Sequence, residues 1–542
     1  MDWNAWVDRY EKLIVFVIIV AVIWLTLLPV IFGYWRAGGQ YHFFTPDFIN
    51  KSDDAVYFSL IEQGRQGKIL FKNLYTPEAQ KAVLFSPLWL IGGWIGTATG
   101  WSNAFVFIFL RSVAAVVFLL CLYFFISYFF TTTKKRLIVF LLTIFASGFG
   151  GIISSSRPVF SAQDVFLLLP TDVWISESNT FLTLLHSALF IFSQTLILAI
   201  FYFFTKKFNE KRFLLVGFLV AVLAIIHPYD IVTICAVLGV YLVFCTWRQK
   251  RIDWHGIATY LWIVFISVWA AVYYYYITKT QIAIGGWADQ NLTVSPPFLS
   301  YLWGYGLVFI LALIGVWVVI KQKKEKFYFI IIWAITSLVL VYLPLNVQRR
   351  FSNGWHVALV ILASVGIFYL APIFRKYATW INSTVFVSFL IICFFVTNFV
   401  IIKQEIDILI DPDFPYLIPN TYYDGFSWIK NNVKPNDVVA ADVQIGNLIP
   451  AFSGRTVYAG HGHQTIDFYQ RRYFLKSWFF KTNDQDAEKK NWLNKNSIDY
   501  IWYSDFEKWN GYFEPGQKDY LEEVYSNQDV KIYQVKQLFT SS

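Results

Sequence analysis

Long apolar runs alternate with short polar segments along most of the chain. A membrane-spanning helix needs roughly 20 consecutive apolar residues. On this criterion the pattern predicts eleven spanning helices, near residues 13–32, 103–130, 137–153, 181–204, 213–228, 229–246, 257–278, 299–320, 327–344, 355–374 and 383–402. A further apolar stretch, residues 83–99, contains Pro87 and several glycines.

The Lys and Arg residues gather in short clusters between these runs, at residues 134–136, 206–212, 248–251, 321–326 and 375–376. The positive-inside rule predicts that all five clusters are cytoplasmic. The helix at 103–130 leads to the first cytoplasmic cluster, so it must enter the membrane from the outer side. If the flank that contains Arg9 and Lys12 is cytoplasmic too, the first helix ends on the outer side, and the stretch 83–99 cannot cross the membrane. We expect it to dip into the bilayer and return, or to lie along the interface. The N-terminus is then inside and the C-terminus outside.

After residue 403 the composition becomes that of an ordinary soluble domain. The pattern predicts a helix over 422–433, helical structure over 465–496, and strands near 438–441, 456–459, 500–504, 521–525 and 530–535. The predicted fold is an all-α polytopic membrane bundle with a small C-terminal extracytoplasmic α/β domain. The bundle covers residues 1–402 and includes a long outer loop, residues 33–102; the α/β domain covers residues 403–542.

Composition supports an integral protein of the cytoplasmic membrane. Hydrophobic residues make up 57% of the 542 residues and charged residues 15%, whereas soluble domains carry about 25% charge. The net charge of +9 does not indicate nucleic-acid binding, because the basic residues occupy the positions of topology signals. The four cysteines lie in or beside apolar runs, so we expect neither disulfides nor a zinc site.

Asp53 and Asp54 stand out in the outer loop because the chain around them contains few acids. One hypothesis is that a carboxylate of the pair removes a proton from an incoming hydroxyl, as a general base does. The alternative is that the pair is simply solvated in a loop or caps a helix, since Asp is a preferred capping residue. The spacing alone favours neither.

Three arginines are candidates for binding a phosphate. Arg349 and Arg350 fall on the predicted outer side, against the positive-inside bias, where they would bind either phospholipid headgroups or the phosphate of a lipid-linked donor. Arg111 lies near the start of a spanning helix, where an unpaired cation is costly. It needs a partner, and an acid of the first loop or a donor phosphate would serve.

Other polar residues on the predicted outer face are candidates for substrate contact. Asp172 and Glu177 form a second acidic cluster; Ser176 or Ser178 beside it could cap the helix that follows, and the alternative is that the acids contact substrate or a divalent metal ion. His227 precedes a proline at a helix corner, where a structural role is common. His461 and His463, with acids nearby in sequence, could hold a metal, but no third ligand has motif spacing. The sequence therefore indicates no certain cofactor, and a requirement for a divalent metal ion stays open.

The segment Asp53-Asp54-Ala55-Val56-Tyr57 resembles the first outer loop of the GT-C superfamily of polytopic glycosyltransferases. It is similar to the protein O-mannosyltransferase and lipid A aminoarabinose transferase branches, and the pattern continues through Gly64, Gly67, Tyr75-Thr76-Pro77-Glu78 and Arg111. The resemblance implies that Asp53 is the catalytic carboxylate, with Asp54 beside it, and that Glu78 contacts substrate.

The chain also resembles less characterised bacterial proteins with the same core. The shared motifs are Thr171-Asp172-Val173-Trp174-Ile175-Ser176-Glu177-Ser178-Asn179-Thr180-Phe181, Gln348-Arg349-Arg350-Phe351, Gly446-Asn447-Leu448-Ile449-Pro450 and Gly460-His461-Gly462-His463. One departure is Phe85-Ser86-Pro87-Leu88, where many relatives carry a His-Pro-Pro type motif; it puts donor contacts there in doubt.

The resemblance implies a polyprenyl-phosphate sugar donor, a glycan, lipid or protein acceptor, and inversion at the sugar carbon. Three alternatives stay open. A secondary transporter predicts inverted repeats and ionisable residues at mid-membrane depth, and the sequence shows neither. A non-catalytic scaffold or biogenesis protein would keep the fold without activity. A polysaccharide polymerase or ligase would use outer arginines without the acid pair.

Overall fold

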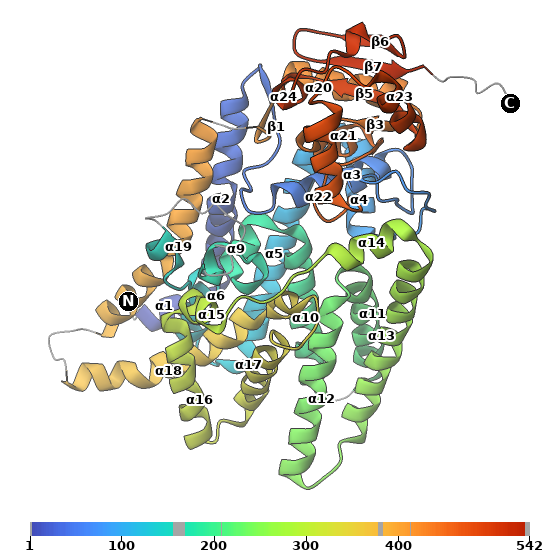
Figure 1. Cartoon of the computed structure of the whole chain (residues 1–542). Helices are drawn as coiled ribbons and strands as arrows, with labels where there is room; N and C mark the ends of the chain where they lie inside the picture. Colours follow the sequence, from blue (N-terminus) through green and yellow to red (C-terminus); the bar gives the residue numbers. More distant parts are fainter. Residues whose placement is uncertain (1–2, 155–168, 207–208, 378–382, 412–413, 537–542) are drawn as a thin grey trace. The chain divides into compact units, whose positions relative to one another are not determined.

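The computed structural model describes residues 3–154, 169–206, 209–377, 383–411 and 414–536 (Figure 1). The chain forms two compact units, each built from separate stretches of sequence. The helical unit consists of Met1–Pro29, Leu110–Val272 and Leu292–Asp407. The mixed unit consists of Val30–Phe109, Tyr273–Asn291 and Ile408–Ser542, so it joins the first long loop to the C-terminal region.

The helical unit contains helices and short 3-10 turns, and several of its helices continue into the mixed unit. Their bounds are α1 Trp3–Arg9, α2 Glu11–Ala37, α5 Asn103–Phe129, α6 Thr133–Phe145, α7 Gly150–Ser154, η1 Thr171–Val173, η2 Ser176–Ser178, α9 Thr180–His186, α10 Ala188–Phe204, α11 Glu210–Ile226, α12 Tyr229–Gln249, α13 Trp254–Thr280, α15 Phe298–Tyr305, α16 Leu307–Lys321, η3 Glu325–Phe327, α17 Tyr328–Leu340, η4 Gln348–Ser352, α18 Trp355–Tyr377 and α19 Ser383–Ile410.

Helices occupy all eleven predicted spans, but the number that crosses a membrane stays a prediction. Within the described residues, six helices are long and apolar enough to span, or seven if the bent pair α15 and α16 is one span. That pair bends by 87° at Gly306, whose φ of 47° is a conformation that other residues rarely adopt. The predicted span 181–204 is also broken, because Ser187 leaves the helical conformation and caps α10 by accepting a bond from Phe190 N.

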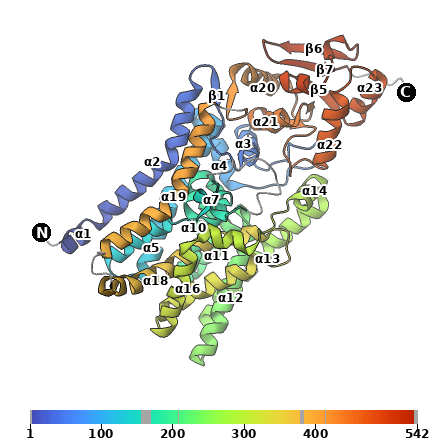
Figure 2. The same ribbon diagram turned by 60° about the vertical axis from the view of Figure 1, so that its left-hand side comes forward.

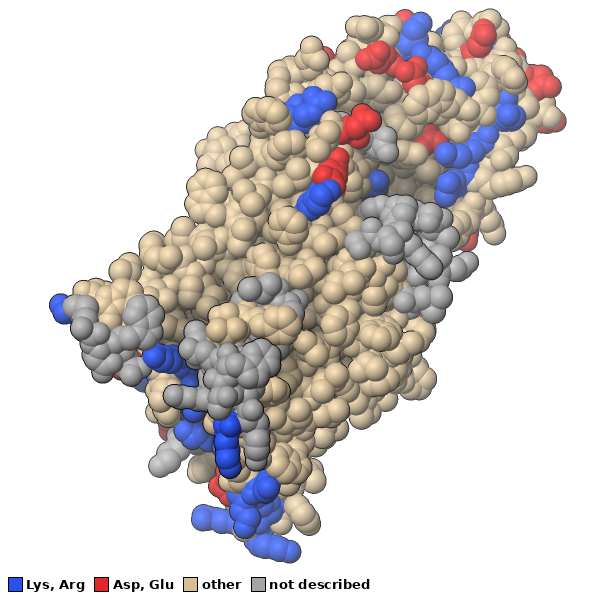
Figure 3. Space-filling model, turned by 90° about the vertical axis from the view of Figure 1, so that its left-hand side faces the viewer, with Lys and Arg blue, Asp and Glu red and all other residues tan. Residues whose placement is uncertain are grey.

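Exposed apolar side chains show which surfaces suit a bilayer. On α13, Leu261, Phe265, Trp269 and Val272 are each between 59% and 69% exposed. Figure 3 shows a broad surface made of uncharged residues, with charged residues near its two ends: mostly Lys and Arg at the lower end, and both signs of charge at the upper end. An uncharged surface of this kind would be costly in water and is expected of helices that face lipid.

Two long helices from opposite ends of the chain, α2 and α19, run side by side in both views (Figures 1 and 2). Near their ends, the guanidinium of Arg36 donates through Nε and Nη2 to the carbonyl oxygen of Ile410, at 3.4 and 3.3 Å. The first long loop follows α2 at this point, and the C-terminal region follows α19. The two segments therefore start next to each other.

The mixed unit contains two sheets and short helices. Its elements are β1 Tyr41–Phe43, α3 Lys51–Arg65, α4 Pro87–Thr99, α14 Ile282–Gln290, β2 Leu417–Pro419, α20 Asn420–Asn432, β3 Val438–Ala440, α21 Val443–Ser453, β4 Thr456–Val457, α22 Phe468–Phe474, the π-helical segment η5 Leu475–Phe479, α23 Asp486–Lys495, β5 Ile498–Tyr503, α24 Asp505–Asn510, η6 Pro515–Gln517, β6 Leu521–Ser526 and β7 Lys531–Val535.

The larger sheet has five strands in the order β4-β3-β5-β7-β6. The three strands β4, β3 and β5 are parallel, whereas β7 pairs antiparallel with both β5 and β6. Helices cover both faces of this sheet, as two neighbouring residues of β5 show. Ile501 joins the buried cluster that holds Phe479 and Leu493 on one face, and Trp502 stacks on Phe426 of α20 on the other. All five predicted strands and the helix 422–433 are confirmed, whereas the region 465–496 is divided and α21 was not predicted.

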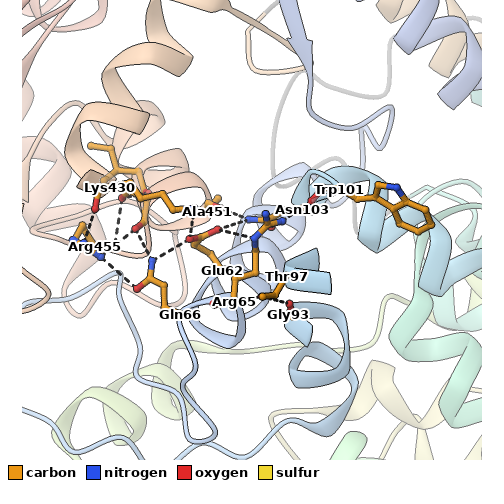
Figure 4. Close-up of polar contacts among 12 residues, drawn as sticks. Glu62, Arg65, Gln66, Gly93, Thr97, Trp101, Asn103, Lys430, Ala451 and Arg455 are labelled. Atoms are coloured by element: carbon orange, nitrogen blue, oxygen red, sulfur yellow. Dashed lines mark hydrogen bonds and ion pairs between the residues drawn. The ribbon is translucent and has the colours of Figure 1, made fainter. Parts of the chain in front are cut away.

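The first long loop is tied to the C-terminal region by a second, two-stranded sheet and by helix contacts. Strand β1 pairs antiparallel with β2, so that His42 lies opposite Ile418. Figure 4 shows Glu62 of α3 among partners from several elements. Lys430 Nζ lies 2.7 Å from Glu62 Oε1, Gln66 Nε2 donates to the same oxygen at 3.0 Å, and Asn103 Nδ2 donates to Oε2 at 3.3 Å.

Arg455, beside this group, satisfies helix-end carbonyls of the C-terminal region. Its Nε donates to Val433 O and its Nη2 to Lys430 O, both at 2.6 Å. Gln66 Nε2 donates in turn to Ser453 O at 3.0 Å. The α3 end of the first loop is thus bonded to α20 and α21 through groups that are mostly buried.

Helices α3 and α4 pack through two glycines. A Cβ added at Gly93 would lie 2.6 Å from Gly64 Cα and 2.8 Å from Arg65 N, so the backbones meet directly. Helix α4 has 13 residues, which gives a length of about 20 Å, less than the roughly 30 Å of hydrocarbon. Helix α17 of a predicted span also has 13 residues, so the expectation that residues 83–99 do not cross the membrane stays a prediction.

We expect Gly93→Ala to destabilise the protein by about 1–3 kcal/mol, because the added methyl forces α3 and α4 apart. The measurement is thermal or denaturant unfolding of the purified protein in detergent. Gly39→Ala is the matched control, since no atom lies within 4 Å of a Cβ placed there. Equal losses in the two variants would contradict the close packing.

Candidate functional site

The acid pair lies in the first turn of α3, where its two members have different surroundings. Asp54 is 2% exposed, and its Oδ2 accepts a hydrogen bond from the Thr45 hydroxyl at 2.6 Å. The capping alternative is wrong, because α3 begins at Lys51 and its N-cap is Asn50. Asp54 therefore anchors the segment before α3 to the helix.

Asp53 meets a histidine from the C-terminal region. Its Oδ1 lies 3.0 Å from Nε2 of His461. The Asp53 side chain is 41% exposed, whereas that of His461 is 5% exposed. A partly exposed carboxylate thus stands against a buried imidazole contributed by a residue 408 positions away.

The other ring nitrogen of His461 is held by the backbone of its own loop. The main-chain N–H groups of His463 and Gln464 both donate to His461 Nδ1, at 3.2 Å each. Thr465 fastens the loop to the first long loop, because its hydroxyl donates to Tyr75 O at 2.8 Å. Gln290 of α14 holds the other side by donating to Thr465 O at 2.8 Å.

Glu78 also bonds to the C-terminal region. Its Oε1 pairs with Arg471 Nη2, and its Oε2 accepts from the hydroxyl of Thr76. Arg471 donates through Nη1 to Tyr458 O at 3.0 Å and lies over the Tyr458 ring. The Glu78 side chain is 23% exposed, and its substrate contact stays a prediction.

In the helical unit, Glu177 pairs with both outer arginines. Its Oε1 lies 3.1 Å from Arg350 Nη1 and 3.4 Å from Arg349 Nε. Burial would raise the pKa of Glu177, but the charges of Arg350 and Arg349 hold that pKa below its ordinary value. The two guanidinium groups lie over the rings of Trp174 and Phe190, and their side chains are 22% and 16% exposed.

Asp172 and His227 are buried in the same unit. Asp172 Oδ2 accepts from Gly148 N at 2.9 Å and Gly150 N at 3.3 Å, and burial raises the pKa of this carboxyl to about 7. His227 Nδ1 lies 2.8 Å from Asp230 Oδ2, which also accepts from Asn353 Nδ2 at 2.8 Å. The predicted substrate contacts of Asp172 and His227 stay predictions.

Arg111 is 4% exposed and bonds to main-chain carbonyls of two neighbouring helices. Its Nη2 donates to Thr26 O of α2 at 3.0 Å, and its Nη1 donates to Leu185 O of α9. The cation is therefore compensated by carbonyl dipoles, a kind of partner that the sequence did not suggest. Its contact with a donor phosphate stays a prediction.

The sequence suggested that His461 and His463, with acids nearby, could bind a metal ion, but Asp442 is engaged elsewhere. Asp442 Oδ2 accepts from Asn510 Nδ2 at 2.9 Å and pairs with Lys476. Across the residues that the structure describes, no three His, Cys, Asp or Glu side chains are placed to hold a metal ion. Sequence reasoning missed the pairing of His461 with Asp53; the only signal was the Gly-His-Gly-His motif itself, which does not name a partner.

The fold and these groups define an integral membrane protein whose first long loop and C-terminal region combine around a carboxylate–imidazole pair. No family model matches the chain, and no curated protein matches it by sequence. Solved structures do match. An oligosaccharyltransferase from Archaeoglobus fulgidus, tethered to an acceptor peptide, aligns at a TM-score of 0.55 and 13% identity, covering 92% of this chain and 70% of that one.

ArnT from Cupriavidus metallidurans matches over nearly the whole length of both chains. With undecaprenyl phosphate bound, it gives a TM-score of 0.51 at 10% identity and 98% coverage of each chain. Its apo form gives a TM-score of 0.51 at 11% identity, with 97% and 98% coverage. The chain thus shares its fold with these two solved proteins, which agrees with the fold that the sequence resemblance implied.

The raised pKa of Asp172 predicts a pH-dependent stability. The native carboxyl keeps its proton up to about pH 7, whereas an unfolded Asp loses it near pH 4. Stability therefore falls as the pH rises through this window, by on the order of a few kcal/mol. We expect the melting temperature in detergent to fall between pH 5 and pH 8 in the wild type and to change less in Asp172→Asn.

Asp407→Asn is the control for this experiment, because Asp407 is an exposed carboxylate of the same unit. It should show the pH dependence of the wild type. A wild-type melting temperature that stays constant across the window would contradict the raised pKa.

Proposed function

We propose that this protein is a glycosyltransferase that moves a sugar from a polyprenyl-phosphate donor to an acceptor hydroxyl, with Asp53 as the general base. The observation that carries the proposal is the carboxylate of Asp53, partly exposed and held at 3.0 Å by a buried imidazole. The GT-C fold supports it, and so does the match to an ArnT structure that contains undecaprenyl phosphate.

The reaction needs one proton acceptor and one good leaving group. Asp53 takes the proton of the acceptor hydroxyl while the oxygen attacks the anomeric carbon of the donor sugar. The bond between that carbon and the phosphate oxygen breaks, and its electron pair leaves with the polyprenyl phosphate. The proton on Asp53 then passes to water. A single attack opposite the leaving group inverts the configuration of the sugar carbon.

Arg349 and Arg350 are proposed to bind the phosphate of the donor. Guanidinium groups suit phosphate because their planar donors match its oxygens. Both side chains are partly exposed and lie against aromatic rings, so each is held in one orientation. Glu177 joins them through a single carboxylate oxygen. Stabilisation of the departing phosphate charge is the catalytic contribution expected from this pair.

The remaining assignments concern substrates and topology. Asp172, Glu177, His227 and Glu78 are proposed to contact substrates or to shape their binding sites, and a glycan, lipid or protein supplies the acceptor hydroxyl. The proposed orientation places the N-terminus inside and the C-terminal region outside the cytoplasmic membrane. The arrangement of the basic clusters between the apolar runs supports this orientation.

Asp53→Asn should lower kcat by about 10²–10⁴-fold, because the amide cannot take up a proton at neutral pH. Its oxygen can still accept the bond from His461, so we expect normal folding. The assay incubates the purified full chain with a panel of polyprenyl-phosphate sugars and hydroxyl acceptors and measures the release of polyprenyl phosphate. Asp505→Asn, an exposed carboxylate of the mixed unit, is the control. Undiminished transfer by Asp53→Asn would remove the assignment.

Arg350→Gln should raise the donor KM by about 10- to 100-fold, since a charge-assisted bond to phosphate is lost. Glu177→Gln is the informative partner variant: it removes the negative charge beside the arginines and should lower the donor KM. If both variants lose stability and neither changes the donor KM, the arginines serve the fold alone. Thermal unfolding of each variant separates the two effects.

A further inference from the structure

The buried imidazole beside Asp53 has its own place in the proposed reaction. We propose that His461 is a positioning residue: its Nε2–H holds Oδ1 of Asp53 and thereby fixes the orientation in which the carboxylate receives the acceptor's proton. This inference rests on the assignment of Asp53 as the base. It gives the C-terminal region a part in the chemistry that the sequence motif alone did not indicate.

The hydrogen bonds of the ring define which nitrogen carries the hydrogen. Nδ1 faces the main-chain N–H groups of His463 and Gln464, at 3.2 Å each. A nitrogen that receives two N–H donors must present its lone pair, so the hydrogen resides on Nε2. That hydrogen points to Asp53 Oδ1, which lies 3.0 Å from Nε2. His461 is therefore a neutral donor to a carboxylate.

This arrangement excludes two other roles for the ring. His461 cannot relay the proton from Asp53, because Nε2 already carries a hydrogen and the lone pair of Nδ1 is engaged. A metal ion on Nε2 would need the lone pair there and would move the hydrogen to Nδ1, against the two backbone N–H groups. The proton taken from the acceptor therefore goes to the Asp53 carboxyl and leaves it for water without passing through His461.

The loop that carries His461 is fixed on several sides. Asn73 Nδ2 donates to Gln464 O at 2.8 Å, and Gly460 N donates to Thr465 Oγ1 at 3.0 Å. A Cβ at Gly460 would lie 2.4 Å from Gly446 O, so the loop lies directly on α21. A side chain mounted on such a loop can hold a partner in one place, which a mobile loop could not do.

The competing explanation is that His461 serves only to close its own loop through Nδ1. Two substitutions separate these roles, because each keeps one half of the ring. Asn places an acceptor near the position of Nδ1 and cannot reach Asp53. Gln is longer and places an amide N–H near the position of Nε2, so it can still donate to Asp53.

For a positioning role, His461→Gln should keep kcat within about fivefold of the wild type, whereas His461→Asn should lose about 10- to 100-fold, the usual loss for one hydrogen bond to a charged group. The KM values for donor and acceptor should change by less than about threefold, since a positioning residue acts through Asp53 and not on the substrates. The reverse order, with Asn active and Gln inactive, would overturn the proposal.

His463→Gln is the matched control. Its side chain is exposed and contacts Gln290 O at 3.1 Å, while its main-chain N–H, which His461 needs, is unchanged. We expect wild-type kcat for this variant. A loss equal to that of His461→Asn would mean that any disturbance of the loop suffices, which would also overturn the positioning role.

A second measurement needs no activity and so separates this inference from the proposed function. The full chain is labelled with ¹⁵N-histidine, and the signals of His461 among the seven histidines are identified by their absence in His461→Gln. The nitrogen shifts should be those of the neutral Nε2–H tautomer, and a protonated Nδ1 would refute the geometry. If Asp53→Asn transfers sugar normally while this tautomer is found, the proposed base is wrong and the contact itself stands.

Discussion

Charge removed from water must be paired, and this requirement governs both units of the chain. Glu62 is buried with Lys430 and two amide donors around it. Glu177 is buried beside Arg349 and Arg350. The cations Lys430, Arg349 and Arg350 come from segments distant in the sequence from the carboxylates that they pair with, so these ion pairs form only when those segments are correctly folded. Removing one partner would leave the other charge buried and uncompensated, which costs the free energy of its desolvation.

In the mixed unit this requirement makes one structure out of the first long loop and the C-terminal region. Within the loop, the buried carboxylate of Glu62 has one nearby cation, Arg65 of the same helix, whose Nε lies 3.8 Å from Oε2. The C-terminal region supplies Lys430 to Glu62, Arg471 to Glu78 and His461 to Asp53. A small α/β fold that looks independent in the sequence therefore completes the electrostatics of the loop. This explains why contact between the two is extensive and polar as well as apolar.

The sequence predicted what depends on local pattern and failed where pairing is long-range. Apolar runs predicted the helices, and short runs of strand-forming residues predicted β3 to β7. Both signals are local, because each lies within a short stretch of sequence. The break at Ser187 and the bend at Gly306 were missed, since a serine or glycine inside an apolar run has several uses. The residue Asp53 was found through its family pattern, but its partner was not. A histidine 408 positions away leaves no periodic trace that could connect it with an aspartate.

The surroundings of two carboxylates differ in charge, which bears on the proposal that Asp53 is the base. A carboxylate beside cations binds a proton less readily than one beside a neutral donor. Glu177 lies between two arginines, which hold its pKa below the ordinary value, and it is 3% exposed. Asp53 instead receives a hydrogen bond from a neutral imidazole and is 41% exposed. The imidazole orients the carboxylate without adding a positive charge that would oppose proton uptake. A lysine or arginine in the place of His461 would hold Asp53 more tightly and make it a weaker base.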